Sequence, residues 1–312
     1  MLIPPFFIDC VAALGNFRAI PQPGEQPSKK QWTTTGTGFF YGDCINPKES
    51  DLNKHQYRTY LVTAKHVIQS HIDKSIDIRV RLNSKDASEP VQDIELPRTV
   101  GGAGQWYFHP NIKIDVAVIA VNWDYLIEHK IEPMFFTNDN SAASRAKLKD
   151  REVAAGDGIY VLGFPMGLTG VQRNYVIVRQ GCIARISEML DGATPEFLID
   201  APAYPGNSGG PVILKPEVFA IDGTKPQQTA TLLGLVIDYL PYEDVAVSIQ
   251  TNRARISFEE NSGLASVLPV DFIDETIAAY QTAFPTAAPA EPEIAPPAKP
   301  EIAPHAGTGT AS

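Results

Sequence analysis

Short apolar segments separated by turn residues recur along most of the chain, and they constrain its fold more than any other feature. They are rich in aromatic and β-branched residues, and 23 glycines and 26 prolines interrupt the sequence. Strands are expected at residues 6–14, 38–41, 60–64, 76–82, 116–121, 158–162, 175–179, 197–199, 211–214, 232–237 and 264–267. Many short strands favour a sandwich or barrels over alternating strand–helix units. We therefore predict an all-β protein.

The expected strands fall into two groups. A first β unit is predicted at about 5–122 and a second at about 156–270, joined by the more polar connector 123–155. One helix is predicted at about 271–283, with Asp271 as its N-cap. Its apolar face is expected to comprise Phe272, Ile273, Thr276, Ile277 and Tyr280, which share helical spacing. The folded domain is thus predicted to span residues 1–284.

Residues 285–312 have a different composition. They contain 7 prolines and 8 alanines, and the sequence Pro-Glu-Ile-Ala-Pro occurs in them twice. Such a segment buries too little apolar surface to offset its ordering entropy, so a disordered tail is expected. A plain linker is the simpler interpretation, and a Pro-rich ligand for a partner domain is the alternative.

Charge and composition exclude several classes of protein. The chain has 26 Lys and Arg against 36 Asp and Glu, a formal charge of −10, which argues against nonspecific nucleic-acid binding. No apolar run is long enough to span a bilayer, and the N-terminus lacks the basic leader of a secretory signal. We therefore expect a soluble, cytoplasmic protein with no membrane or nucleic-acid partner. The oligomeric state is left open.

The cysteines and histidines do not indicate a metal or disulfide framework. The three cysteines form no Cys-x-x-Cys pair, and the six histidines include no His-Glu-x-x-His. Free thiols, no metal and no cofactor are therefore expected. A Cys10–Cys44 bridge remains an open alternative, because the sequence does not give the separation of these residues.

The strongest local motif is the run Gly206-Asn207-Ser208-Gly209-Gly210-Pro211. A serine on a tight glycine turn exposes its Oγ, and the surrounding N–H groups can converge on one point. Acyl transfer needs both features, a nucleophile and donors for the oxyanion. By itself the motif is equally compatible with a simple hairpin turn.

Two further residues complete a catalytic set. His66 follows the apolar segment Leu61–Ala64, and Asp115 precedes the apolar segment Val116–Ile119. A histidine at a strand end is usually structural, and an Asp before a strand is usually a turn residue. Their joint occurrence with Ser208, in the order His66, Asp115, Ser208, favours a catalytic triad.

These blocks resemble the signatures of trypsin/chymotrypsin-like serine proteases: Thr63-Ala64-Lys65-His66, Asp115-Val116-Ala117 and the Ser208 motif. The resemblance implies two six-stranded antiparallel β-barrels with a C-terminal α-helix and an active site between the barrels. It also implies that Ser208 is the nucleophile and His66 the general base, oriented by Asp115. The backbone N–H groups of Gly206 and Ser208 would form the oxyanion hole. His109, in a His-Pro pair upstream of Asp115, is expected to be structural.

Within this family the chain most resembles the HtrA/Deg branch. The similar segments are Gly36-Thr37-Gly38-Phe39, Val161–Leu168, Asp200–Ser208 and Gly263–Pro269. Asn207 replaces the acid that pairs with a new N-terminus in secreted members, so no zymogen cleavage is expected. The 285–312 segment is too short and too Pro-rich for the PDZ domain that HtrA/Deg proteins usually carry.

The resemblance places the substrate pocket near Pro202, Ile237 and Tyr239. Pro202 stands where trypsin-like specificity needs an acid, so we expect cleavage of proteins or peptides after small or medium apolar residues. Asp238 would introduce a charge into the pocket if the alignment were shifted by one residue. The predicted function is that of a serine endopeptidase. The alternative is a catalytically idle or partner-activated module of the same fold that acts through protein binding.

Overall fold

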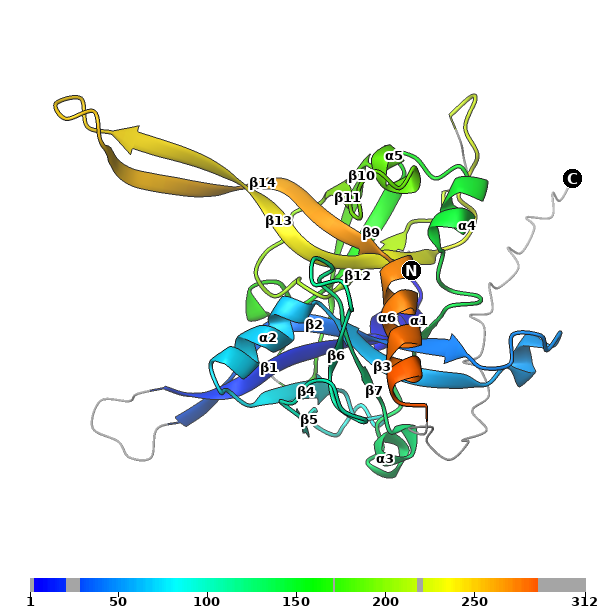
Figure 1. The fold of residues 1–312 in the computed structure, drawn as a ribbon. Coiled ribbons are helices and arrows are strands. Elements are labelled where there is room, and N and C mark those ends of the chain that lie inside the picture. The colour runs from blue at the N-terminus through cyan, green and yellow to red at the C-terminus, as the bar shows by residue number, and fades with distance from the viewer. Residues whose placement is uncertain (1–2, 21–28, 171, 218–220, 286–312) are drawn as a thin grey trace, which may run out of the picture.

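The computed structural model describes residues 3–20, 29–170, 172–217 and 221–285. Two β units are stacked one above the other, and one long helix runs beside them (Figure 1). The N-terminal unit is drawn in blue to teal and the C-terminal unit in green to orange. The predicted tail 285–312 lies outside the described residues apart from Pro285.

The first unit is a sheet of eight strands. Seven follow the order β5-β4-β1-β2-β3-β7-β6 with antiparallel pairing, and β8 pairs in parallel with β2. The strands are β1 (Val11–Ile20), β2 (Lys29–Cys44), β3 (Tyr57–Thr63), β4 (Ile78–Leu82), β5 (Gln92–Leu96), β6 (Tyr107–Phe108), β7 (Ala117–Ala120) and β8 (Phe136–Thr137).

The second unit is a closed antiparallel barrel. Its order is β10-β11-β14-β13-β12-β9. The strands are β9 (Gly158–Gly163), β10 (Ile177–Arg185), β11 (Phe197–Asp200), β12 (Pro211–Leu214), β13 (Thr231–Val247) and β14 (Ala254–Pro269). Beyond the barrel, β13 and β14 continue as a paired hairpin that projects away from both units (Figure 1).

Helices connect and flank these sheets. They are α1 (Pro5–Asp9), η1 (Leu52–Lys54), α2 (Lys65–Asp73), α3 (Trp123–Glu128), α4 (Arg145–Asp150), η2 (Pro165–Gly167), α5 (Ser187–Leu190) and α6 (Val270–Ala283), where η denotes a 3-10 helix. In the described part of the chain, no helix combines the length and the apolar character needed to cross a bilayer.

Strand alternation divides the interior into three apolar clusters. Along β2, Phe40 faces the core of the first unit, whereas Phe39 and Tyr41 face a core shared by both units. Along β9, Val161 points into the barrel and Leu162 into the shared core. The two units are therefore joined by close-packed apolar side chains.

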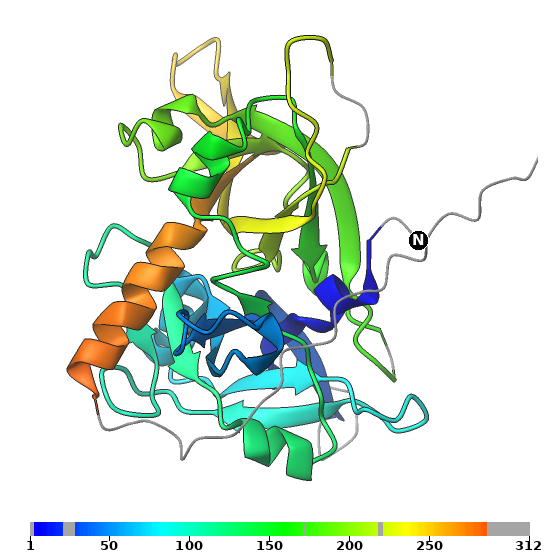
Figure 2. The same cartoon turned by 90° about the vertical axis from the view of Figure 1, so that its right-hand side faces the viewer.

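Helix α6 lies across this junction (Figure 2). It emerges from β14 of the barrel, yet several of its side chains bond to the first unit. Tyr41 donates its hydroxyl hydrogen to Asp274 at 2.7 Å, and Gln281 donates to Asp43 at 2.7 Å. The Gly104 N–H donates to the Tyr280 hydroxyl at 3.2 Å. The last element of the chain thus fastens the second unit to the first.

The predicted all-β, two-unit architecture with a C-terminal helix is confirmed, and the second unit is a six-stranded barrel as predicted. The first unit differs, because it has eight strands rather than six and one parallel pair. The added strand β8 comes from the predicted connector 123–155. That segment also contains α3 and α4, which begin after the capping residues Asn122 and Ser144.

Two local predictions were wrong. The segment 6–14 is not one strand: α1 precedes β1, because Pro5 fixes a helical φ at the first helical position. Asp271 is not the N-cap of α6, since Pro269 occupies that position. The Asp271 carboxylate instead accepts a hydrogen bond from the Arg145 N–H at 2.8 Å.

The attachment of α6 makes stability depend on pH. Burial raises the pKa of Asp274 from 3.8 to about 6, with smaller contributions from Asp43 and Asp271. The folded state therefore binds this proton more tightly than the unfolded state. We predict that the contribution of Asp274 to the unfolding free energy falls as pH rises from about 4 to about 6.

Urea unfolding between these pH values tests this prediction. Asp274→Asn should flatten the slope of unfolding free energy against pH, whereas Asp222→Asn, at an exposed site, should keep it. Equal slopes in the wild type and Asp274→Asn would contradict the assignment.

Candidate active site

His66 lies at the second position of helix α2, directly after strand β3. Ala64, the residue before the helix, is fully buried, and Val67 is buried on the other side of His66. These two apolar anchors hold the start of the helix against the first unit. The His66 side chain remains about half exposed, at 49%. The backbone at His66 is thus held in place, whereas its imidazole ring is accessible to solvent.

Asp115 binds His66 through both carboxylate oxygens. Oδ1 accepts a hydrogen bond from the His66 backbone N–H at 2.9 Å, and Oδ2 lies 2.6 Å from Nδ1. The buried neighbours Ile114 and Val116 anchor the carboxylate. The Asp115 carboxylate therefore accepts a hydrogen bond from an N–H at the start of α2 and also orients the imidazole. Because Nδ1 faces Asp115, Nε2 takes no part in this contact.

Ser208 lies on the glycine turn between β11 and β12. The turn requires glycine at two positions: Gly206 has φ +101° and Gly209 has φ +82°. A Cβ at Gly206 would meet the Phe164 carbonyl oxygen at 2.4 Å, and one at Gly209 would meet the Thr37 carbonyl oxygen at 2.2 Å. The backbone around Ser208 is therefore packed too closely for any side chain at these positions.

Thr37 of strand β2 connects the Ser208 turn to the first unit. Its N–H donates to the Ser208 carbonyl at 2.9 Å, and its hydroxyl donates to the Gly206 carbonyl at 2.6 Å. The same hydroxyl accepts from the Phe164 N–H at 3.1 Å. Thr37 is fully buried, so these bonds are shielded from water.

The structure brings the three predicted triad residues to the same junction. A Cβ at Gly36 would meet the Val67 side chain at 2.7 Å and the Ser208 carbonyl oxygen at 3.2 Å, so the Ser208 backbone lies beside the start of α2. Among the described residues, no hydrogen bond joins the Ser208 hydroxyl to His66. Such bonds are often long before substrate binds and tighten in the complex.

The predicted oxyanion donors face no competing acceptor. Within the described ranges, the N–H groups of Gly206 and Ser208 make no hydrogen bond, although the neighbouring Asn207 N–H donates to the Tyr204 carbonyl at 2.9 Å. Asn207 is 1% exposed, and its Oδ1 has no partner in the described part of the chain. The turn thus leaves two backbone donors available for a negatively charged oxygen.

The predicted substrate-binding strand lies directly beside this turn. Gly209 N–H donates to the Val236 carbonyl at 2.7 Å, and Val236 N–H donates to the Gly210 carbonyl at 2.9 Å. Ile237, at a bulge in β13, and Tyr239 are half-buried, whereas Pro202 is exposed.

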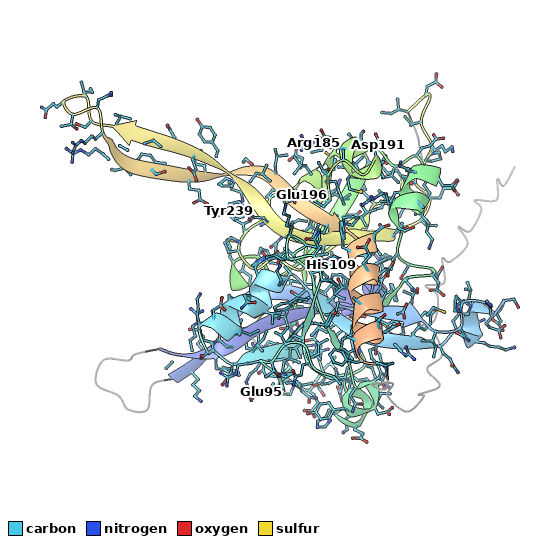
Figure 3. The ribbon with its side chains drawn as sticks, viewed as in Figure 1. Glu95, His109, Arg185, Asp191, Glu196 and Tyr239 are labelled. Carbon is cyan, nitrogen blue, oxygen red and sulfur yellow. The ribbon has the colours of Figure 1, made fainter. Side chains whose placement is uncertain are left out.

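Asp238, the residue that would charge the pocket under a one-residue shift, is exposed. Its Oδ1 accepts from the Tyr239 N–H at 2.8 Å. The Tyr239 hydroxyl bonds to Glu259, and Figure 3 shows Tyr239 at the base of the projecting hairpin.

His109 packs against helix α6 and is not part of the contact between His66 and Asp115. Figure 3 shows it next to α6, where its ring meets Phe272 edge to face and its Nε2 lies 3.2 Å from Glu275. The backbone N–H of His109 donates to the Val116 carbonyl, and this bond fixes the start of the strand that follows Asp115. These contacts connect α6 to the first unit.

The family model for the trypsin-like peptidase domain matches residues 36–218, which is more than half of the chain. The chain belongs to the trypsin-like peptidase family. The match covers His66, Asp115 and Ser208 and ends before the projecting hairpin of β13 and β14. No curated protein matches the sequence significantly.

The sequence did not reveal the importance of Thr37 for this trypsin-like site. The sequence feature that could have indicated this role is the pair of flanking glycines, Gly36 and Gly38. They let β2 approach neighbouring segments of the chain closely. Sequence reasoning also missed Met166 of η2, whose N–H donates to the Pro205 carbonyl at 2.7 Å. Met166 is 57% exposed beside the Ser208 turn. Only the fold brings these residues to Ser208.

Replacing Thr37 by Val should destabilise the turn. The substitution keeps the shape but leaves the Gly206 carbonyl and the Phe164 N–H without their buried partner. Each orphaned group costs about 1–3 kcal/mol. With two groups orphaned, urea unfolding should show a loss of about 2–6 kcal/mol, and Thr37→Ser, which keeps the hydroxyl, should lose much less. Equal stability of Thr37→Val and the wild type would show that the hydroxyl does not support the turn.

Proposed function

We propose that this protein is a serine endopeptidase that cleaves peptide bonds through His66, Asp115 and Ser208. The observation that carries the proposal is the pair of hydrogen bonds that the Asp115 carboxylate accepts from His66, beside the glycine turn of Ser208. A partly buried acid that orients an exposed imidazole next to a serine suits proton transfer. Membership of the trypsin-like peptidase family supports the same reaction class.

The first half of the reaction forms an acyl-enzyme. With Nδ1–H donating to Asp115, Nε2 of His66 carries a lone pair and takes the proton of the Ser208 hydroxyl. Oγ then attacks the substrate carbonyl carbon, and the resulting oxyanion binds the N–H groups of Gly206 and Ser208. The C–N bond breaks as His66 returns the proton to the leaving amine. Asp115 stabilises the imidazolium throughout.

The second half releases the acid product. A water molecule gives its proton to Nε2 of His66 and attacks the acyl carbonyl, and the ester bond to Ser208 then breaks. The proton returns from His66 to Oγ, so the enzyme is restored. Every proton in this cycle moves between groups of the chain, substrate and water, and no cofactor takes part.

Loss of any member of the triad should abolish most turnover. We predict that Ser208→Ala, His66→Ala and Asp115→Asn each lower peptide hydrolysis by about 10⁴-fold. Labelling with a fluorophosphonate probe should be lost in Ser208→Ala. The matched control is Ser257→Ala, at an exposed serine of the projecting hairpin, which should label like the wild type. Equal labelling of wild type and Ser208→Ala would mean that another residue is the nucleophile.

A partner-activated module is the second candidate function. The observation that favours it is that, among the described residues, the Ser208 hydroxyl makes no hydrogen bond with His66. Contact of a partner with the η2 loop would shift the Ser208 turn, because Met166 bonds to Pro205. If the purified wild type neither labels nor cleaves peptides, this candidate, or an idle scaffold, replaces the constitutive enzyme.

We also propose that the chain is close to the HtrA/Deg branch and that its partner is a protein or peptide substrate. The four similar sequence segments support the first point. For specificity, we propose cleavage after small or medium apolar residues. Pro202 supplies no charge, and Ile237 and the buried Ala203 give the strand and turn beside Ser208 an apolar character.

Profiling with a peptide library tests the specificity. The wild type should cleave after residues such as Ala or Val and disfavour Lys and Arg. Asp238→Ala should keep this preference, because the Asp238 carboxylate is exposed and bonds to the Tyr239 N–H. A wild-type preference for Lys or Arg that disappears in Asp238→Ala would place Asp238 in the pocket and overturn the proposed specificity.

A further inference from the structure

Three chain segments bring metal-binding side chains together away from Ser208. Cys44 is the last residue of β2, His55 follows η1, and Asp139 lies in the loop after β8. One donor atom from each, a thiol sulfur, an imidazole nitrogen and a carboxylate oxygen, lies within 4.8 Å of the other two. Donors that bind one ion at about 2.0–2.3 Å lie at most about 4.6 Å apart, so the three are near the spacing of a single-ion site and need only small side-chain shifts to bind one.

The donors converge on the same atom of the imidazole. Nδ1 of His55 lies 3.5 Å from the Cys44 sulfur and 2.5 Å from Oδ2 of Asp139. A single proton on Nδ1 can serve only Asp139, which leaves the thiol with a distant contact at 3.7 Å to Asn46 Oδ1. A cation at this point would engage all three donors.

The outer contacts match those of metal-binding residues. The other ring nitrogen of His55, Nε2, lies 2.8 Å from the Glu49 carbonyl oxygen, so its N–H donates there and Nδ1 faces the cluster. The Tyr57 hydroxyl donates to the Asp139 carboxylate at 3.1 Å. Metal ligands are usually oriented by such carbonyl and hydroxyl partners.

Burial and charge favour a divalent ion. Cys44 is 8% exposed and His55 4% exposed, so the cluster is largely removed from water. A divalent cation would bind the deprotonated thiolate together with the Asp139 carboxylate, and the two negative charges would neutralise it. The site would then carry no net charge.

We propose that Cys44, His55 and Asp139 bind a structural Zn²⁺ ion through Sγ, Nδ1 and Oδ2. A thiolate combined with an imidazole and a carboxylate selects Zn²⁺ over Mg²⁺ or Ca²⁺, which take oxygen ligands. On binding, the Cys44 thiol and Nδ1 of His55 each release a proton to solvent, while the Nε2–H of His55 keeps its hydrogen bond to the Glu49 carbonyl. Asn46 Oδ1 lies 3.7 Å from the Cys44 sulfur and accepts from the Gln56 N–H at 2.7 Å, so water would complete the coordination. The ion would hold the loop between β2 and β3 against the loop after β8.

This proposal departs from the sequence-based expectation of no metal. His55 is 11 residues from Cys44 and 84 residues from Asp139, so no ligand spacing is visible in the chain. It also stands apart from the proposed catalytic mechanism, because none of its residues belongs to the Ser208 site.

Direct metal binding by the full-length protein tests the proposal. We expect one equivalent of Zn²⁺ to bind in competition with a chromogenic chelator and to raise the melting temperature. Co²⁺ in its place should give a sulfur-to-cobalt charge-transfer band in the near ultraviolet. Loss of an outer partner alone weakens metal binding by about 10–100-fold, so Cys44→Ser should weaken it by at least about 100-fold.

Variants separate this site from adventitious binding. His55→Gln and Asp139→Asn should also weaken Zn²⁺ binding, whereas Cys182→Ser, at the half-buried thiol of β10, should bind like the wild type. If the wild type binds no stoichiometric Zn²⁺, or if the charge-transfer band persists in Cys44→Ser, the proposal is wrong. The cluster would then be a buried imidazolium–carboxylate pair beside a thiol.

Discussion

The position of the candidate nucleophile depends on Thr37, a buried residue of the other β unit. Its N–H, carbonyl and hydroxyl all make short bonds, to the Ser208 carbonyl, the Thr63 hydroxyl and the Gly206 carbonyl. Thr63 belongs to β3, three residues before His66, so the same network reaches the imidazole-bearing helix. The geometry of the proposed triad is therefore set by a hydrogen-bond network that crosses the junction between the units, where low polarity strengthens each bond.

The units around this network are held together by packing rather than by a covalent connection alone. Side chains from β2 and β9 share one apolar core, and α6 adds polar bonds at its edge. Close-packed interfaces of this kind resist small displacements, because each shift opens voids or creates overlap. That rigidity suits the proposed triad, in which His66 and Ser208 come from different units and need ångström-level alignment.

Sequence reasoning succeeded where a residue's role is encoded by its immediate neighbours. The blocks around His66, Asp115 and Ser208 each combine a reactive side chain with local apolar or glycine residues, and the structure brings all three to one junction. It failed where distant segments meet. The cluster of Cys44, His55 and Asp139 has no periodicity, and β8 is only two residues long. The projecting part of β13 and β14 is exposed on both faces, so it has no inward–outward alternation to mark it as strand.

The closure of the barrel has a consequence for how the protein is made. The Ser208 turn bonds to Val236 of β13, and the barrel closes only when β14 pairs with β11. During synthesis, His66 and Asp115 leave the ribosome long before the residues up to Pro269 that complete β14. The Ser208 turn cannot be held against them until then. A nascent chain that lacks a complete β14 therefore has no assembled candidate site, and under the proposed function it cannot cleave itself or neighbouring nascent chains at that stage.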